Sequence, residues 1–182
     1  RYIHAAAAAD YQGEIVTTTR EGQKWHDLVD EFGIRWSMPD NAPLYMDITH
    51  HPLANATIED IASYPFPRGD DPGRFERLRE EALTIRNETP FALVSGISGV
   101  VYEICWYMRG LERWFMDMLE QPQFCEALLD RTLQFWMDWF DGFLKEVGDL
   151  VDIIMVGDDI AGQRGPLFQP AFYHRTVQPR QK

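Results

Sequence analysis

Residues 151–159 read VDIIMVGDD, a short and mostly apolar run followed by a glycine and two aspartates. Apolar runs of this length that do not alternate with polar residues are typical of strands buried on both faces of a parallel sheet. A second run, FALVSG at 91–96, leads into the glycine- and serine-rich sequence SGISG at 95–99. The two runs predict two buried, parallel strands, each ending in polar residues.

Helical patterns surround these two runs. Residues 100–119 fit a helix with one glycine interruption, and residues 122–148 fit a second helix with a single apolar stripe. A further helix is expected to open at Asp71 and Pro72, as an N-cap followed by proline, and a last one at Pro170. Strands separated by helices in this order predict a parallel α/β fold.

The first part of the chain has a different amino-acid composition. Residues 1–70 are rich in proline, aromatic residues and short apolar runs, whereas residues 71–182 carry the strand–helix units. Short strands are predicted at 15–19, 34–38 and 44–49. At 182 residues the chain is expected to form a single domain. It is shorter than the ~250 residues of a closed eightfold barrel, which predicts an open sheet or a piece of something longer.

Charge and cysteine content exclude several classes of function. The 17 Lys and Arg residues against 29 Asp and Glu residues give a net charge of −12, which opposes binding to nucleic acids and anionic membranes. No run approaches the ~18 apolar residues of a membrane span. The two cysteines, Cys105 and Cys125, lie apart in helix-like stretches and suggest small buried side chains. We therefore expect a reduced, cytoplasmic protein acting on a small molecule.

The candidate catalytic residues follow from the predicted sheet. Ligands of parallel α/β folds bind at the carboxyl ends of the strands, so Ser95 and Ser98 after one strand should lie near Asp158 and Asp159 after the other. Successive strand residues point to opposite faces. Asp159 is therefore the favoured catalytic residue, with Asp158 as its support or as a cap of a neighbouring helix. Paired aspartates after a strand also serve as simple loop caps, and both interpretations stay open.

Other side chains extend the candidate site. Gln163 and Arg164 lie in a glycine-flanked loop, where an amide and a guanidinium suit an anionic or planar polar ligand. Trp106, Tyr107 and Arg109 follow the first strand and are candidate substrate contacts, although helix packing is an ordinary alternative for the two aromatic residues. The spacing of the histidines and cysteines predicts no metal site.

Three segments resemble the uroporphyrinogen decarboxylase superfamily. They are SGISGVVYEICWYMRG at 95–110, the segment from VDIIMVGDDIAGQRGPLF to the chain end at 151–182, and PLANATIEDIASYPFPRGDDPGRF at 52–75. Members of this superfamily are (β/α)8 barrels. The resemblance implies an α/β fold in which this chain is a central part of a TIM barrel, with parallel strands.

The superfamily contains two chemistries, and the resemblance implies one of them. Its decarboxylases remove acetate carboxyl groups from uroporphyrinogen without a cofactor, toward coproporphyrinogen in porphyrin biosynthesis. Its corrinoid-dependent methyltransferases commonly use zinc held by His and Cys. This sequence departs from the decarboxylases: Asp159 stands where they carry a serine, and Trp106, with Tyr107 beside it, where they carry a tyrosine.

The first expectation is a lyase that decarboxylates a tetrapyrrole, and the alternative is a corrinoid-dependent methyltransferase. In the methyltransferase interpretation, zinc and a corrinoid are the cofactors and their ligands are expected outside this chain. A homodimer and a corrinoid protein are the macromolecular partners that the resemblance allows. A non-catalytic fragment or binding module is the remaining alternative.

Overall fold

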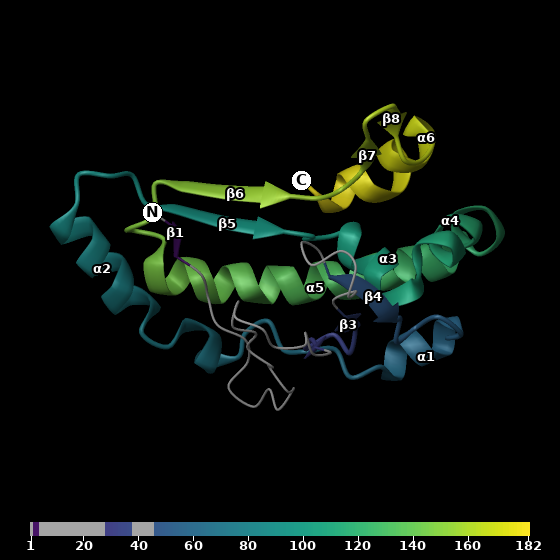
Figure 1. Cartoon of the computed structure of the whole chain (residues 1–182), viewed down its shortest axis with the longest axis horizontal. Coiled ribbons are helices and arrows are strands. Elements are labelled where there is room, and N and C mark those ends of the chain that lie inside the picture. The colour runs from purple at the N-terminus through teal and green to yellow at the C-terminus, as the bar shows by residue number, and fades with distance from the viewer. Residues whose placement is uncertain (1, 4–27, 38–45) are drawn as a thin grey trace, which may run out of the picture.

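The structure is a computed structural model that describes residues 2–3, 28–37 and 46–182, with the backbone alone at 2–3 and 96–98. The strand predicted at 15–19 lies outside the described residues. Within them, the chain forms a parallel sheet packed on helices, a small antiparallel sheet and a C-terminal hairpin with a short helical segment (Figure 1).

The parallel sheet has three strands in the order β1–β5–β6. Its members are β1 (Tyr2–Ile3), β5 (Val94–Ser98) and β6 (Ile153–Gly157). β5 pairs in parallel with both neighbours, and Ser98 lies opposite Gly157. Figure 1 shows β5 and β6 running side by side along α5 (Pro122–Val147), with their carboxyl ends toward α3 (Glu103–Arg109). The predicted parallel α/β arrangement is confirmed, and the described residues do not close into a barrel.

The helices between β5 and β6 match their predicted places. Gly110, with a φ of 90°, separates α3 from α4 (Leu111–Glu120), because this backbone conformation favours glycine. Pro122 then opens α5 at its first position, where a missing amide hydrogen costs nothing. α5 ends at Val147, and Gly148 is its C-cap residue.

The helix predicted from Asp71 is interrupted. The Asp71 carboxylate accepts a hydrogen bond from the Gly73 amide at 2.8 Å and caps a 3-10 turn, η1 (Pro72–Phe75). The turn ends at Phe75, and Arg77, with a φ of 63°, is the N-cap of the α-helix proper, α2 (Leu78–Glu88).

The N-terminal part forms a separate antiparallel sheet. Its strands are β2 (Leu28–Val29), β3 (Arg35–Ser37) and β4 (Asp47–His50), and α1 (Ile58–Ser63) follows. The strands predicted at 34–38 and 44–49 are confirmed, with slightly different bounds.

The chain after β6 forms a hairpin and then short helical turns. The hairpin strands are β7 (Ala161–Gly162) and β8 (Gly165–Pro166), followed by α6 (Pro170–Phe172), the π-helical turn η2 (Tyr173–Val177) and η3 (Gln178–Arg180). The predicted last helix is therefore present as a short, irregular segment.

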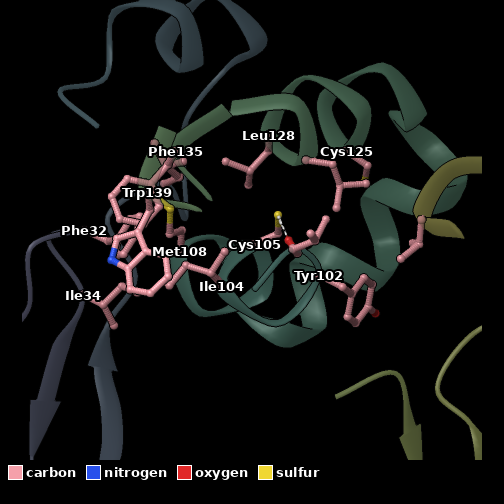
Figure 2. Packing of buried hydrophobic residues seen from close by; sticks show 14 of the residues in the cluster. Phe32, Ile34, Tyr102, Ile104, Cys105, Met108, Cys125, Leu128, Phe135 and Trp139 are labelled. Atoms are coloured by element: carbon pink, nitrogen blue, oxygen red, sulfur yellow. Dashed lines mark hydrogen bonds between the residues drawn. The ribbon is translucent and has the colours of Figure 1, made fainter. Parts of the chain in front are cut away.

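The core lies between α3 and α5. Figure 2 shows Cys105 and Met108 of α3 near Leu128 and Trp139 of α5, and all four side chains are buried. Cys125 is also fully buried, which confirms the packing role expected of both cysteines. Within the described part of the chain, no helix has the length and apolar character needed to cross a membrane.

Burial of β6 was predicted and is wrong for this structure. Ile153, Met155 and Val156 are 53%, 52% and 58% exposed. β6 is an edge strand, with β5 on one side only, and no described strand pairs with its other side. The continuous apolar pattern therefore identified the strand correctly, and the exposure reflects its edge position.

Candidate functional site

The carboxyl ends of β5 and β6 meet at one edge of the sheet. The amide of Gly99, directly after β5, donates to the carbonyl of Gly157, the last residue of β6, at 2.9 Å. The predicted juxtaposition of residues 95–99 with residues 158–159 is confirmed at this edge. The side chains that follow the two strands therefore define the candidate site.

Asp158 caps the start of α3. Its carboxylate accepts hydrogen bonds from the amides of Tyr102 at 2.8 Å and Glu103 at 2.7 Å, and a longer one from Val101 at 3.3 Å. The amide side chain of Gln181 adds a bond at 2.9 Å. A carboxylate at a helix start satisfies amides that have no partner within the helix. Asp158 thus ties the end of β6 to α3, which is the capping role considered for it in the sequence.

Asp159 is exposed beside this cap. Its carboxylate lies close enough to α3 to raise the pKa of Glu103 and of Tyr107 by charge repulsion. Asp159 therefore stands at the same strand-end edge as these two side chains, free of the backbone bonds that hold Asp158.

Glu103 is the buried acid of this edge, with 6% of its surface exposed. One carboxyl oxygen accepts a short hydrogen bond from the Tyr107 hydroxyl, one helical turn away. The other, Oε2, is buried and has no hydrogen-bond partner among the described residues. Burial raises the pKa of Glu103, and the charges of Asp159 and Asp158 add to this rise. The hydrogen bonds from the Tyr107 hydroxyl and from the Asp159 backbone amide lower it.

Aromatic rings enclose Tyr107. The ring of Trp106 lies 4.2 Å and that of Trp36 5.1 Å from the Tyr107 ring, both edge to face. The indole of Trp36 is held in turn by Asp30, whose carboxylate accepts its N–H at 2.8 Å. Tyr107 and Trp106 are each partly exposed. The two aromatic residues predicted near the site are thus next to Glu103, on the same helix.

Arg109 does not belong to this edge and is a correction to the sequence-based site. Its guanidinium is 3% exposed and its Nε donates to the Asp117 carboxylate at 2.6 Å. Nη1 donates to the carbonyls of Leu53 at 2.5 Å and Ala56 at 2.8 Å. With these donors bound inside the protein, Arg109 joins α3 to α4 and to the segment before α1, and it is a structural residue.

The serines also differ from their predicted place. β5 extends to Ser98, so neither serine lies in a loop after the strand. Ser95 is buried within β5, three residues before its end, which is roughly 10 Å from the edge at the usual rise of a strand. Ser98 ends the strand, and its side chain is outside the described part of the structure.

Gln163 and Arg164 form the turn of the β7–β8 hairpin, between Gly162 and Gly165. The predicted flexible loop is therefore a tight two-residue turn. Both side chains are exposed, and among the described residues neither has a hydrogen-bond partner in the structure. The protein therefore exposes both side chains without holding either in place.

An apolar cavity of about 460 Å³ lies on the α5 side of the strand ends. Trp136, Met137 and Phe140 of α5 and Val156 of β6 line it, and Asp158 is its acidic member. Glu103 and Tyr107 do not line this cavity. It is therefore separate from the polar cluster formed by Glu103, Tyr107 and Asp159.

The described residues do not fit a zinc ion. No group of three or more His, Cys, Asp or Glu side chains among them is placed to hold a metal. Cys105 and Cys125 are both buried, and burial raises the pKa of the Cys125 thiol to about 12, which opposes the thiolate form that zinc requires. His51 is also engaged, with Nδ1 2.7 Å from the carbonyl of Tyr107.

Glu103 is the residue that the sequence-based site omitted. Its position four residues before Tyr107 places both side chains on one helix face. An acid in an otherwise apolar stretch, paired at this spacing with a tyrosine, was a signal that could have identified it.

A solved structure of a methyltransferase from Methanosarcina mazei has a similar fold. The TM-score is 0.55 at 18% sequence identity, and the match covers 84% of this chain and 43% of that chain. At this identity the likeness establishes the fold alone, and the chain spans less than half of the length of that methyltransferase. No family model matches the sequence, and no curated protein matches it.

Proposed function

We propose that this chain is part of a methyl-transfer enzyme whose active site lies at the carboxyl ends of β5 and β6. The observation that most supports this proposal is the cluster of Glu103, Tyr107 and Asp159 at the strand ends. In this cluster Glu103 is buried and does not have a full set of hydrogen-bond partners. Buried polar groups without partners are rare in proteins and often mark functional sites.

The fold match supports methyl transfer over decarboxylation. The similar structure is a methyltransferase, and the superfamily that the sequence resembles includes corrinoid-dependent methyltransferases. The charge of the site points the same way. Uroporphyrinogen carries many carboxylates, which Asp159 and the net charge of −12 would repel. Arg109, predicted as a substrate contact, is bound to Asp117 instead.

The residues of this chain would bind and orient the methylated substrate. Asp159 is exposed and supplies a fixed negative charge beside the reacting group, which stabilises positive charge that develops there. Asp158 holds the end of β6 against α3 and so fixes where Asp159 lies relative to Tyr107. Arg164 and Gln163 would contact polar parts of the substrate from the hairpin turn.

A corrinoid, when bound, would supply the atom that accepts or donates the methyl group, and zinc would activate a thiol acceptor. The described residues offer no zinc site, so no step at this edge is assigned to zinc. In this proposal the described residues of the chain bind and orient the substrate at one end of its site.

The test is to incubate the full chain with a methylated corrinoid and a thiol and to follow demethylation of the corrinoid by its absorbance. Asp159→Asn should reduce turnover by about 100-fold, because it removes the charge that faces the reacting group. Asp141→Asn, an exposed aspartate on α5, is the matched control and should leave turnover unchanged.

Parallel incubation with uroporphyrinogen separates the alternatives. Release of carbon dioxide without methyl transfer would overturn the proposal in favour of a decarboxylase. A folded protein that binds a methylated corrinoid but turns over neither substrate would indicate a binding module.

A further inference from the structure

We propose that Glu103 and Tyr107 form a two-member proton relay, in which the buried carboxyl group stores a proton and the tyrosine hydroxyl delivers it to a ligand at the strand ends. Glu103 is a positioning residue that acts through Tyr107. The proposal depends on the proposed function only in placing a ligand at this edge, and it holds for any substrate that takes up a proton there.

The geometry of the pair carries the proposal. Glu103 is 6% exposed, and its Oε2 has no hydrogen-bond partner among the described residues. The tyrosine hydroxyl bonds to the buried acid, and the Tyr107 side chain as a whole, in contrast, is partly exposed. A proton on the buried acid therefore has one described side-chain route outward, through Tyr107.

The groups around the pair favour a stored proton. Asp158 and Asp159 face it from the end of β6, and both raise the pKa of Glu103. From the antiparallel sheet, the Trp36 ring packs on the Tyr107 ring, and Asp30 bonds to the indole of Trp36 and not to the pair itself. The chain segment after β4 contributes His51, which contacts the Tyr107 carbonyl and not its hydroxyl. Within the described residues, no lysine or arginine side chain bonds the Glu103 carboxylate.

The relay balances in one concerted step. In the resting pair the Glu103 carboxyl hydrogen is donated to the Tyr107 hydroxyl oxygen, and the Tyr107 hydroxyl hydrogen is turned toward the ligand. As the ligand atom takes the tyrosine hydrogen, the Glu103 hydrogen moves to the tyrosine oxygen. The products are a protonated ligand, a neutral tyrosine and an ionised Glu103, whose carboxylate now accepts the hydrogen bond from Tyr107, as in the structure. No oxidant or other reactant is needed.

Infrared spectroscopy tests the stored proton directly, without any substrate. The carbonyl stretch of a protonated carboxylic acid is recorded across a pH series for the full chain and for Glu103→Gln. Subtracting the two spectra isolates Glu103 from Asp30, whose pKa is also raised by burial. Glu88→Gln, at an exposed glutamate, is the matched control. We expect a Glu103 band that persists to a higher pH than the Glu88 band, and absence of that band would overturn the relay.

Two further variants must shift the Glu103 band in opposite directions. Tyr107→Phe removes a hydrogen bond that lowers the pKa of Glu103, so the band should persist to still higher pH. Asp159→Asn removes a nearby negative charge that raises this pKa, so the band should disappear at lower pH. A buried glutamate that is only structural, and not coupled to Tyr107, would not respond to Tyr107→Phe, and that result would contradict the proposal.

Turnover gives an independent check once methyl transfer is measured. Transfer from a methylated corrinoid to a thiol releases a proton, so this check uses a methyl donor whose leaving group takes one up, such as an alcohol. With that donor, activity should fall at the pH at which the infrared band of Glu103 disappears, because the relay is then empty. Activity that continues unchanged beyond that pH would overturn proton delivery. Conversely, a chain that transfers no methyl group but shows the band and both opposite shifts would overturn the proposed function and leave the proton-holding pair intact.

Discussion

Each end of α3 carries a buried ionisable residue, and the two residues differ in how completely they are hydrogen-bonded. At the C-terminal end, Arg109 is bonded to Asp117 and to two backbone carbonyls, and its guanidinium lies 3.9 Å from the centre of the Phe124 ring. At the N-terminal end, Glu103 has one side-chain partner among the described residues, Tyr107, and the Asp159 backbone amide lies near enough to lower its pKa. Its oxygen Oε2 is buried without a well-formed hydrogen bond. A fully bonded buried charge serves stability, whereas an incompletely bonded one costs stability and is retained for another reason.

The largest expected effect is at the bonded end. Arg109→Met leaves the Asp117 carboxylate, which is fully buried, without its main partner. Breaking a buried ion pair on one side typically costs about 3–5 kcal/mol, so the free energy of unfolding should fall by this amount in urea denaturation. A loss below about 1 kcal/mol would show that Arg113, which also contacts Asp117, is enough to hold it.

Removal of the cap should have an intermediate effect. Asp158→Ala frees the amides of Tyr102 and Glu103 at the start of α3. The expected loss is about 1–2 kcal/mol of unfolding free energy, the range of capping side chains. Asp158→Asn keeps an acceptor oxygen and should lose less. Equal losses in both variants would show that the charge of Asp158, and not its hydrogen bonds, stabilises the helix start.

The unsatisfied end should show a small effect with a distinctive dependence on pH. Burial raises the pKa of Glu103 in the folded protein, so the folded state binds a proton more tightly than the unfolded state does. Wild type should therefore lose stability relative to Glu103→Gln as the pH rises from the ordinary glutamate pKa toward the raised value, and remain constant above it. Thermal unfolding of both proteins across this range measures the difference, and an opposite slope would contradict a raised pKa.

The smallest effect is expected at an exposed ion pair. Arg79 and Asp149 are joined at 2.8 Å but are 45% and 61% exposed. Because water screens such pairs, Arg79→Ala should leave the unfolding transition within experimental error. This variant is the reference against which the variants at Arg109, Asp158 and Glu103 are compared.

The difference between the ends of α3 also explains what the sequence could predict. Strands, helix breaks and the shared edge of residues 95–99 and 158–159 follow from apolar runs, Gly110 and Pro122, which act locally. The role of Arg109 depends on Asp117 and on carbonyls more than 50 residues earlier in the chain, and no local pattern specifies these contacts. Burial of Glu103 likewise depends on tertiary packing, so its spacing from Tyr107 could have indicated a pair but not its burial.

The edge position of β6 has a consequence for handling the polypeptide. An apolar outer strand whose far side pairs with no described strand offers its peptide groups as a template on which the same sequence from another molecule could assemble. Asp152 and Asp158 flank the run from Ile153 to Gly157, and paired like charges at the two ends of such a run act as gatekeepers against stacking. The Asp152→Asn variant should therefore turn cloudy at a lower protein concentration than the wild type.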